Sequence, residues 1–336
     1  MPDSNPIRMG LIGAGIFARD AHLPALQELG AEIYKITAIC SRTKESATRL
    51  AKEIPYPVEI TTDIATLLAR DDVDAVNIML PIDLMPSVVQ MALDSGKHVI
   101  SEKPVAPDVK TGKELLSNYK ADCVWMVAEN FRYQETFIRA AELIKNGEIG
   151  KPLLANWTTH IPFTADNKYY HTDWRRDGSF PGGIFLDGGV HSIAVLRLLF
   201  GEITKVNAFA TYDRSDLPGI NTISSNLEFD SGLIANYSVT FSAAKYWSSP
   251  LTVCGEDGLL EVDFDKIAII KNDESHTISF NDINNVRAEL SAFAASINDG
   301  SHHLNSPEQA LQDVAIIEAL LQATKIGQSV IPERIV

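Results

Sequence analysis

Apolar runs and helix-like segments alternate along the first 130 residues. Runs such as IRMGLI (7–12) and KITAICS (35–41) are apolar at nearly consecutive positions, which predicts strands buried on both faces. The segments between such runs have apolar residues three or four positions apart, which predicts helices with one apolar face. Alternating strands and helices predict a doubly wound parallel sheet, an α/β fold of the Rossmann type. The other predicted strands are 58–61, 73–80, 97–101 and 123–128, and the predicted helices are 16–29, 44–54, 63–71, 85–96 and 108–120.

The pattern changes after residue 130. Strand-like runs with short turn signals between them follow one another from residue 203, which predicts an open, mainly antiparallel sheet. We therefore expect a first domain over 1–130 and a second α/β domain over 131–336. The other elements predicted for the second domain are a helix at 134–147, a strand at 151–160, a loop rich in aromatic and charged residues at 161–183, and helices at 184–200, 284–299 and 307–326.

Composition limits the classes of partner. The chain has 336 residues, of which 45% are hydrophobic, so it can bury a sizeable core. It carries 44 acidic against 29 basic residues and a net charge of -15, which argues against non-specific nucleic-acid binding. An anionic cofactor stays possible, because helix N-termini and a few local bases can hold phosphate groups.

The number and spacing of the cysteines, the N-terminal sequence and the hydropathy indicate the cellular compartment of the protein. Cys40, Cys123 and Cys254 show no disulfide or zinc spacing, and an odd number suits reduced thiols. The N-terminal MPDSNPIRMG lacks the basic and then apolar pattern of a secretory signal. No apolar run approaches the length of a membrane span. We therefore expect a cytoplasmic protein with no membrane partner.

The glycine-rich stretch after the first predicted strand has the form GxGxxA, from Gly13 to Ala18. In this position Gly13 allows a sharp turn, Gly15 lets the backbone approach a diphosphate, and Ala18 lets the helix pack on the strand. An ordinary turn would also use glycine, but the place between strand and helix favours a dinucleotide site. The expected contacts are Gly13, Ala14, Gly15, Ile16 and Phe17.

The second predicted strand ends without the acid that usually binds the ribose hydroxyls of NAD. Ser41 and Arg42 stand there instead, and Lys44 follows. A hydroxyl and a guanidinium can bind a 2′-phosphate, so this turn favours NADP, although it does not exclude NAD. The alternative is a solvated basic turn at the start of a helix.

The stretch VISEKPVA (99–106) ends a predicted buried strand with Glu102, Lys103 and a proline. Ligands of open α/β sheets bind beyond the carboxyl ends of the strands. A partly desolvated lysine beside a nicotinamide can exchange a proton with a substrate hydroxyl or carbonyl oxygen. An exposed lysine in a loop is the alternative.

Three stretches together resemble one family: AGIFARDAHLP (14–24), GKHVISEKP (96–104) and DGGVH (187–191). The chain resembles, over essentially its whole length, the glucose–fructose oxidoreductase, inositol dehydrogenase and rhizopine-catabolism family, Gfo/Idh/MocA. The resemblance implies a nucleotide-binding first domain and a second domain for substrate binding and oligomerisation. It also implies that Lys103 is catalytic, and we place Glu102 and Lys103 among the cofactor contacts.

The resemblance also assigns Asp187 and His191, which lie four residues apart and so share one face of the predicted helix. His191 can act as general acid or base, and Asp187 can orient the substrate or the histidine. A helix-cap aspartate and a buried histidine are the alternative. A metal site that combines them with His160 or His171 is disfavoured by the spacing, and we expect no metal.

The chain departs from the family after the strand that ends NIMLP. The family usually has a Thr-Pro pair and then a histidine, whereas this chain has Leu80, Pro81 and, near the histidine position, Met85. Pro81 can still shape the loop below the nicotinamide. We keep Leu80 and Pro81 as cofactor contacts.

Two more stretches contain candidate contacts. AENFRYQ (128–134) follows the last Rossmann strand, and KYYHTDWRRD (168–177) lies in the long loop before DGGVH. Relatives with a Trp-Arg pair in that loop use it near cofactor and substrate; a loop packed by its own aromatic residues is the alternative. The expected cofactor contacts are Asn130 and Arg175, and the expected substrate contacts are Arg132, Tyr133, Tyr170 and Trp174 beside Lys103, Asp187 and His191.

These observations predict an NADP-dependent oxidoreductase that moves a hydride between the nicotinamide and a C–OH/C=O centre of a sugar, cyclitol or related polyol. Two alternatives stay open: a relative with a non-sugar substrate, similar to biliverdin reductase or dihydrodiol dehydrogenase, and a non-catalytic NADP-binding regulator. The open sheet of the second domain must be covered, which predicts a homodimer or homotetramer.

Overall fold

The computed structural model describes residues 5–178, 180–281 and 284–336. The chain divides into two compact units. The first unit is Met1–Asn130 with Val286–Leu311, and the second is Phe131–Asn285 with Gln312–Val336. The first division of the chain falls after Asn130. The assignment of all of 131–336 to one domain needs a correction, because Val286–Leu311 packs with the first unit.

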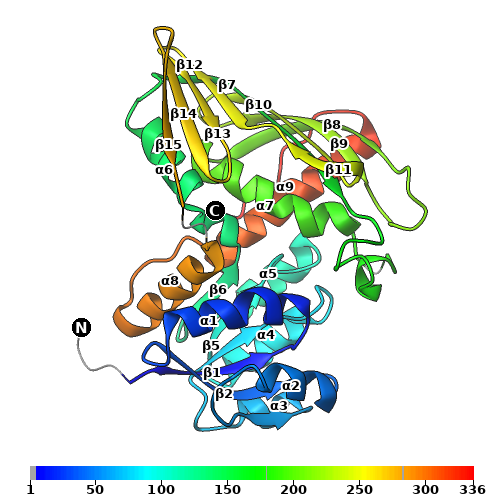
Figure 1. The fold of residues 1–336 in the computed structure, drawn as a ribbon. Coiled ribbons are helices and arrows are strands. Elements are labelled where there is room, and N and C mark those ends of the chain that lie inside the picture. The colour runs from blue at the N-terminus through cyan, green and yellow to red at the C-terminus, as the bar shows by residue number, and fades with distance from the viewer. Residues whose placement is uncertain (1–4, 179, 282–283) are drawn as a thin grey trace. The chain divides into compact units, whose positions relative to one another are not determined.

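A six-stranded parallel sheet forms the core of the first unit (Figure 1). Its strand order is β3-β2-β1-β4-β5-β6, so the direction of winding reverses between β1 and β4. This is the arrangement in which ligands bind beyond the carboxyl ends of the strands. The Rossmann prediction is confirmed. The strands are β1 (Ile7–Ile12), β2 (Tyr34–Cys40), β3 (Glu59–Thr61), β4 (Ala75–Ile78), β5 (His98–Glu102) and β6 (Trp125–Ala128).

Side-chain caps begin three of the helices in this unit. Thr43, Asp63 and Asp108 each accept a hydrogen bond from the N–H three residues later, which satisfies one free donor of the first turn. The segment predicted as one helix over 16–29 contains a π-helical turn, η1 (Ala18–His22), before α1 (Leu23–Leu29). The other helices are α2 (Lys44–Ala51), α3 (Ile64–Leu68), α4 (Met85–Asp94) and α5 (Val109–Asn118).

The segment that returns to the first unit contains α8 (Asn285–Asp299) and fits closely against the sheet and helices. Tyr34 donates its hydroxyl to the Leu290 carbonyl over 2.7 Å. Gly112 in α5 leaves room for Leu311, whose Cδ1 would lie 2.2 Å from a Cβ at that position. These contacts explain why the segment belongs to the first unit.

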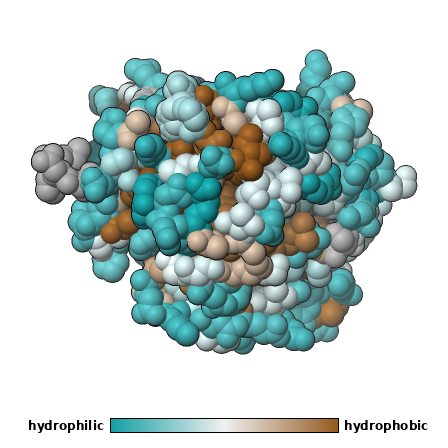
Figure 2. Space-filling model, turned by 90° about the horizontal axis from the view of Figure 1, so that it is seen from below, coloured by the Kyte–Doolittle hydropathy of each residue, from teal (hydrophilic) through white to brown (hydrophobic). Residues whose placement is uncertain are grey.

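Hydrophilic side chains cover most of the face seen in Figure 2, and smaller apolar areas lie among them. Large apolar side chains of the first unit that stay exposed include Leu84 and Met91 at α4, which are 51% and 41% exposed. Scattered exposed apolar residues of this kind are ordinary on protein surfaces.

A nine-stranded sheet forms the second unit, with order β15-β14-β13-β12-β7-β10-β9-β8 and β11 paired to β7. Within this sheet only β7 and β10 pair in parallel among the described strands, so the prediction of a mainly antiparallel sheet is confirmed. The strands are β7 (Pro152–Pro162), β8 (Ile203–Thr211), β9 (Thr222–Phe229), β10 (Ile234–Thr240), β11 (Ser242–Ser248), β12 (Leu251–Gly255), β13 (Leu259–Val262), β14 (Lys266–Lys271) and β15 (Glu274–Ser279).

Burial alternates along β9 and β10, so one face of this sheet is packed and the other faces outward. Helices α6 (Glu135–Lys145), α7 (Gly183–Phe200) and α9 (Pro307–Ile326) lie on the packed side (Figure 1). Helix α7 has the length and composition of a membrane span, which corrects the expectation that no segment does. Because 78% of it is buried within the protein, we interpret α7 as a core helix.

Two glycines in the middle of α7 have a packing reason. A Cβ at Gly188 would lie 2.9 Å from the ring of Phe241, and a Cβ at Gly189 would lie 3.0 Å from the ring of Phe185. Glycine costs about 1 kcal/mol relative to alanine inside a helix. Close packing offsets this cost, so the helix predicted over 184–200 forms despite its glycines.

Candidate active site

The loop after β1 has the conformation that a dinucleotide cradle needs. Gly13 has φ +109°, and a Cβ there would lie 2.2 Å from the carbonyl oxygen of Met79, so only glycine fits. A Cβ at Gly15 would meet no atom within 4 Å. The backbone at Gly15 is therefore open to an approaching group, and helical structure starts at Ile16. This geometry fits a diphosphate at a helix N-terminus.

The turn after β2 presents basic side chains to solvent. Thr43 caps α2, while Arg42 and Lys44 on either side of it are exposed. Neither cation makes a hydrogen bond or ion pair with the described part of the chain. Two such cations at the carboxyl end of β2 can bind the phosphate of an adenosine ribose.

The turn after β4 leads directly into α4. The Pro81 carbonyl accepts hydrogen bonds from the N–H groups of Leu84 and Met85. Met85, near the position where the family usually has a histidine, is fully buried in α4. It therefore contributes packing and no polar group, whereas Leu80 and Pro81 are half-buried at the strand end.

The end of β5 is held by a buried hydrogen-bond chain. The Asn77 amide nitrogen lies 2.8 Å from Nδ1 of His22, and Nε2 of His22 lies 2.6 Å from Oε1 of Glu102. With Nδ1 as acceptor, the proton of a neutral imidazole is on Nε2 and is donated to Glu102. The π-helical turn η1 contains His22, and its side chain is completely buried. Lys103, the next residue after Glu102, is half-buried.

In the second unit, α7 carries Asp187 and His191 as predicted. Arg175 donates from Nε to Oδ2 of Asp187 over 2.7 Å, and both side chains are largely buried. The Arg175 guanidinium also stacks 4.0 Å from the ring of Trp174. His191, half-buried, stacks on Phe131 with 4.5 Å between ring centroids. The structure thus brings Trp174 and Arg175 of the long loop to the aspartate of DGGVH.

Tyr170 has a partner in its own unit. Its hydroxyl donates to Oδ2 of Asp216 over 2.6 Å, and Arg214 donates to the same carboxylate. The Arg214 hydrogen bond, followed by that from Tyr170, lowers the pKa of Asp216 well below its usual range. The Tyr170 hydroxyl is thus held by a carboxylate from outside the 161–183 loop, while its ring lies 5.9 Å from that of Phe163 within the loop. Tyr133, in the turn η2 (Asn130–Tyr133), is half-buried.

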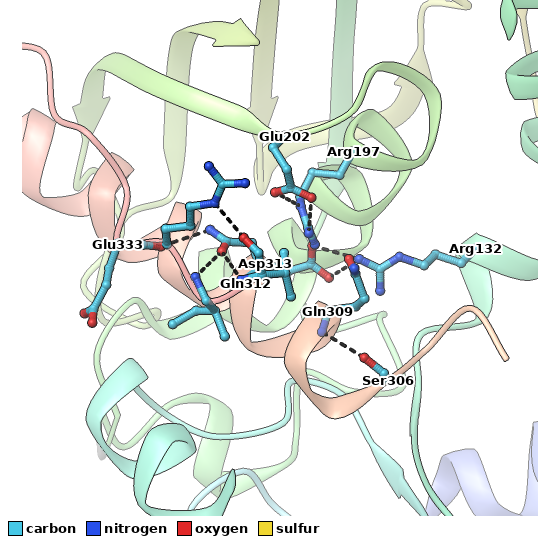
Figure 3. Close-up of polar contacts among 11 residues, drawn as sticks. Arg132, Arg197, Glu202, Ser306, Gln309, Gln312, Asp313 and Glu333 are labelled. Atoms are coloured by element: carbon cyan, nitrogen blue, oxygen red, sulfur yellow. Dashed lines mark hydrogen bonds and ion pairs between the residues drawn. The ribbon is translucent and has the colours of Figure 1, made fainter. Parts of the chain in front are cut away.

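Arg132 differs most from its expected role as a substrate contact. Its side chain is buried, and Nη2 donates to both oxygens of Asp313 over 2.6 and 2.9 Å. Arg197 donates to the same carboxylate over 2.7 Å and to Glu202 over 2.6 Å, so Asp313 lies between two guanidinium groups (Figure 3). We therefore remove Arg132 from the substrate contacts, because a buried ion pair already holds its guanidinium.

Sequence reasoning missed His22 and Asn77, although the histidine lies in one of the stretches that carry the family resemblance. It also missed Glu289 of α8, a buried carboxyl group. The sequence does indicate Glu289, because the helical spacing of Val286, Leu290 and Phe293 predicts an apolar residue at this position of α8 and a glutamate stands there.

Comparisons with known proteins agree with this geometry. Residues 7–131 match the model of the oxidoreductase family with an NAD-binding Rossmann fold, and residues 137–261 match the GFO/IDH/MocA C-terminal domain. The chain is 33% identical to dehydrogenase FPY6 of Fusarium mangiferae, over 94% of this chain and 95% of that protein. It is 28% identical to D-xylose 1-dehydrogenase (NADP(+)) 2 of Haloferax volcanii, over 96% and 98%. An oxidoreductase from Thermotoga maritima has a TM-score of 0.91 and 37% identity, over 97% and 98% of the two chains.

Proposed function

Since this chain belongs to the Gfo/Idh/MocA family of oxidoreductases and has its NAD-binding Rossmann domain, we propose that it uses NADP to transfer a hydride to or from a C–OH/C=O centre of a sugar, cyclitol or related polyol. One observation carries the proposal: the open glycine loop, the basic turn at Arg42 and the half-buried Lys103 all follow carboxyl ends of strands in one parallel sheet. The name of the xylose dehydrogenase relative supports a sugar and NADP.

The described residues fit a nicotinamide dinucleotide. The backbone from Gly13 to Phe17 would hold the diphosphate, and Ser41, Arg42 and Lys44 would hold the 2′-phosphate. The other proposed contacts lie at strand ends or in the second unit. When bound, the nicotinamide accepts or supplies the hydride. The remaining proposed cofactor contacts are Leu80, Pro81, Glu102, Lys103, Asn130 and Arg175.

The proton follows a separate route from the hydride. During oxidation the substrate hydroxyl loses its proton to a base as its carbon loses a hydride; during reduction an acid returns the proton to the carbonyl oxygen. We assign this proton to Lys103 and His191. Asp187, fixed by Arg175, would orient the substrate or His191. Tyr133 and Trp174 remain proposed substrate contacts. For Tyr170, only the aromatic ring remains a proposed substrate contact, because its hydroxyl binds Asp216.

The proposal is tested by NADPH absorbance with a panel of sugars, cyclitols and polyols. Lys103→Met keeps most of the side-chain stem but removes the proton carrier, so kcat should fall by roughly 10²–10⁴ with little change in NADPH affinity. His191→Asn should flatten the pH profile of kcat/KM, which rises with pH in oxidation and falls in reduction when a histidine carries the proton. Unchanged turnover in both variants would remove these residues from the mechanism.

Cofactor preference has its own test. Arg42→Ala should weaken NADPH binding about tenfold to a hundredfold, because a charge-assisted contact contributes about 1.5–3 kcal/mol, and should leave NADH binding nearly unchanged. Arg49→Ala, an exposed arginine of α2, is the matched control. Equal affinity of the unmodified protein for the two cofactors contradicts the NADP assignment. Tight NADPH binding without turnover of any panel member would favour the regulatory alternative.

We also propose that the protein is a cytoplasmic homodimer or homotetramer joined through the outward face of its nine-stranded sheet. The strand register places Asn207, Asn226, Asn236 and Asn156 side by side across β8, β9, β10 and β7. Asn236 donates to Asn156 over 3.0 Å. A row of side-chain amides with exposed apolar residues beside it, such as Ile234 and Phe209, suits a self-complementary interface.

Asn226→Lys places like charges opposite each other in such an interface and should shift the mass measured by light scattering toward the monomer. Asn118→Lys, on the exposed surface of α5, is the control. A monomeric unmodified protein contradicts the proposed assembly. The free thiols of Cys40, Cys123 and Cys254 suit a reducing cytoplasm.

A further inference from the structure

Glu289 is a carboxylic acid within the apolar core of the first unit. Its side chain is completely buried, and it lies on the same face of α8 as the buried side chains of Val286, Leu290 and Phe293. Neither of its carboxyl oxygens has a hydrogen-bond partner in the part of the chain that the structure describes. A buried, ionised carboxylate without partners is very unfavourable, so the group avoids that state by keeping its proton.

The charged groups that act on Glu289 are also acids. Burial raises its pKa well above the ordinary value, and the charges of Glu102 on β5 and Glu129 after β6 raise it further. Glu102 is the partner of His22, and the cation on α8 itself, Arg287, faces Glu28 at 3.6 Å. Among the described residues no base is found to favour the charged form of Glu289. The geometry and the charges agree on a neutral acid.

The position of this acid gives it a link to the proposed chemistry. Glu102 is the last residue of β5 and directly precedes Lys103, while Glu129 directly follows β6 and precedes Asn130. The returning segment also binds this edge, because Asn305 donates to the Glu129 carbonyl and accepts from the Val127 N–H, both over 3.0 Å. Glu289 therefore belongs to a segment that binds the end of β6, and it lies within electrostatic range of Glu102 at the end of β5.

We propose that Glu289 is a positioning residue: as a neutral acid it packs α8 against the ends of β5 and β6, and loss of its proton sets an upper pH limit on the reaction. The inference rests on the proposed function for its link to Lys103. When Glu289 gives its proton to solvent, a third carboxylate joins Glu102 and Glu129 in a largely buried site. Water must then enter around α8, which loosens the strand end that carries Lys103.

The protonation state can be measured without any substrate. The infrared spectrum of the full-length protein at pH 7 should contain the C=O band of a protonated carboxyl group, and the band should be absent in Glu289→Gln. Glu28→Gln, at an exposed carboxylate beside the same helix, should leave the band unchanged. A wild-type spectrum without this band at pH 7 overturns the proposal, and does so whether or not the protein is a polyol dehydrogenase.

Stability gives a second readout with a defined sign. An acid whose pKa is raised in the folded protein stabilises it fully at low pH, and this contribution is lost as pH rises from the unfolded-state pKa toward the folded-state pKa. Glutamine keeps the neutral shape at every pH. Glu289→Gln should therefore match the wild-type Tm near pH 4 and exceed it by roughly 2–10 °C at pH 7. A lower Tm for Glu289→Gln at pH 7 contradicts a neutral acid.

Kinetics separates positioning from simple packing. At pH 7, Glu289→Gln should keep kcat within about twofold of wild type, since no contact to the reacting atoms changes. Its activity should extend to higher pH than that of the wild type. Glu289→Ala, which leaves a cavity, should lose activity at all pH values. If Glu289→Gln and wild type share one alkaline limb while the infrared band is present, the acid is neutral but does not set the pH limit, and the link to Lys103 fails.

Discussion

The two units each bury a cluster of charged side chains, and the clusters are built in opposite ways. In the second unit every carboxylate of the cluster faces a base: Asp313 lies between Arg132 and Arg197, and Arg197 also binds Glu202. In the first unit, Glu102 has His22 as its partner, whereas the charges of described residues that act on Glu289 are those of other acids.

The difference shows how to separate structural from functional burial of charge. A buried ion is tolerated when a partner of opposite charge and hydrogen bonds replace water. The Asp313 cluster meets this condition and joins distant parts of one unit. A buried acid without such partners keeps its proton above the ordinary pKa of a carboxyl group, and strongly shifted pKa values are characteristic of sites that control chemistry.

The largest effect is expected at Asp313. Asp313→Asn keeps the shape of the side chain but leaves two buried guanidinium groups without a full counter-charge. The free energy of unfolding should fall by about 3–5 kcal/mol, the usual result of breaking a buried ion pair from one side. Urea titration followed by fluorescence measures it. A loss below about 1 kcal/mol would mean that the cluster is hydrated in solution and resembles a surface pair.

The same carboxyl-to-amide change should have the opposite sign at Glu289. Each pH unit between the unfolded-state and folded-state pKa contributes about 1.4 kcal/mol in favour of the neutral amide. Glu289→Gln should therefore raise the free energy of unfolding at pH 7 by about 1–3 kcal/mol, and the gain should disappear as the pH falls toward 4. Urea titrations at a series of pH values follow the trend. A pH-independent difference would indicate a packing change alone.

The smallest effect belongs to an exposed pair that serves as reference for both clusters. Lys205 and Glu228 lie 2.6 Å apart on β8 and β9, with both side chains 48% exposed. Glu228→Gln should change the free energy of unfolding by no more than about 1 kcal/mol, and added salt should reduce the difference further. A larger effect of Glu228→Gln would show that the distance between the two charged groups, and not their burial, determines how much an ion pair contributes to the free energy of unfolding.

The sequence was sufficient for features that depend on local pattern. The strands of the first unit were predicted because buried parallel strands are continuous apolar runs, and the dinucleotide loop was predicted because Gly13 and Gly15 stand between a strand and a helix. The helix with Asp187 and His191 was also predicted, although the reason for its two glycines came only from Phe241 and Phe185.

Contacts between residues far apart in the sequence could not be predicted from local patterns. Arg132 and Asp313 are separated by 181 positions, so nothing near Arg132 in the sequence indicates an ion pair, and its place in AENFRYQ predicts a substrate contact instead. The return of Val286–Leu311 to the first unit was missed for the same reason, because helical spacing identifies α8 but not the surface that it covers. The π-helical turn that contains His22 could not be predicted from apolar residues with a period of 3.6, because a π-helix has a different hydrogen-bond spacing.

The returning segment has a consequence for synthesis on the ribosome. The nascent Rossmann sheet emerges first, but Leu290 and Leu311, which contact Tyr34 and Gly112, belong to the last part of the chain. At 5–20 residues per second, the 155 residues of 131–285 need roughly 8–31 s. During that interval the apolar surface that α8 later covers stays open to chaperones and to other nascent chains. Of the two units, the nucleotide-binding one therefore starts to form before the other, but it is completed only after α8 has been synthesised.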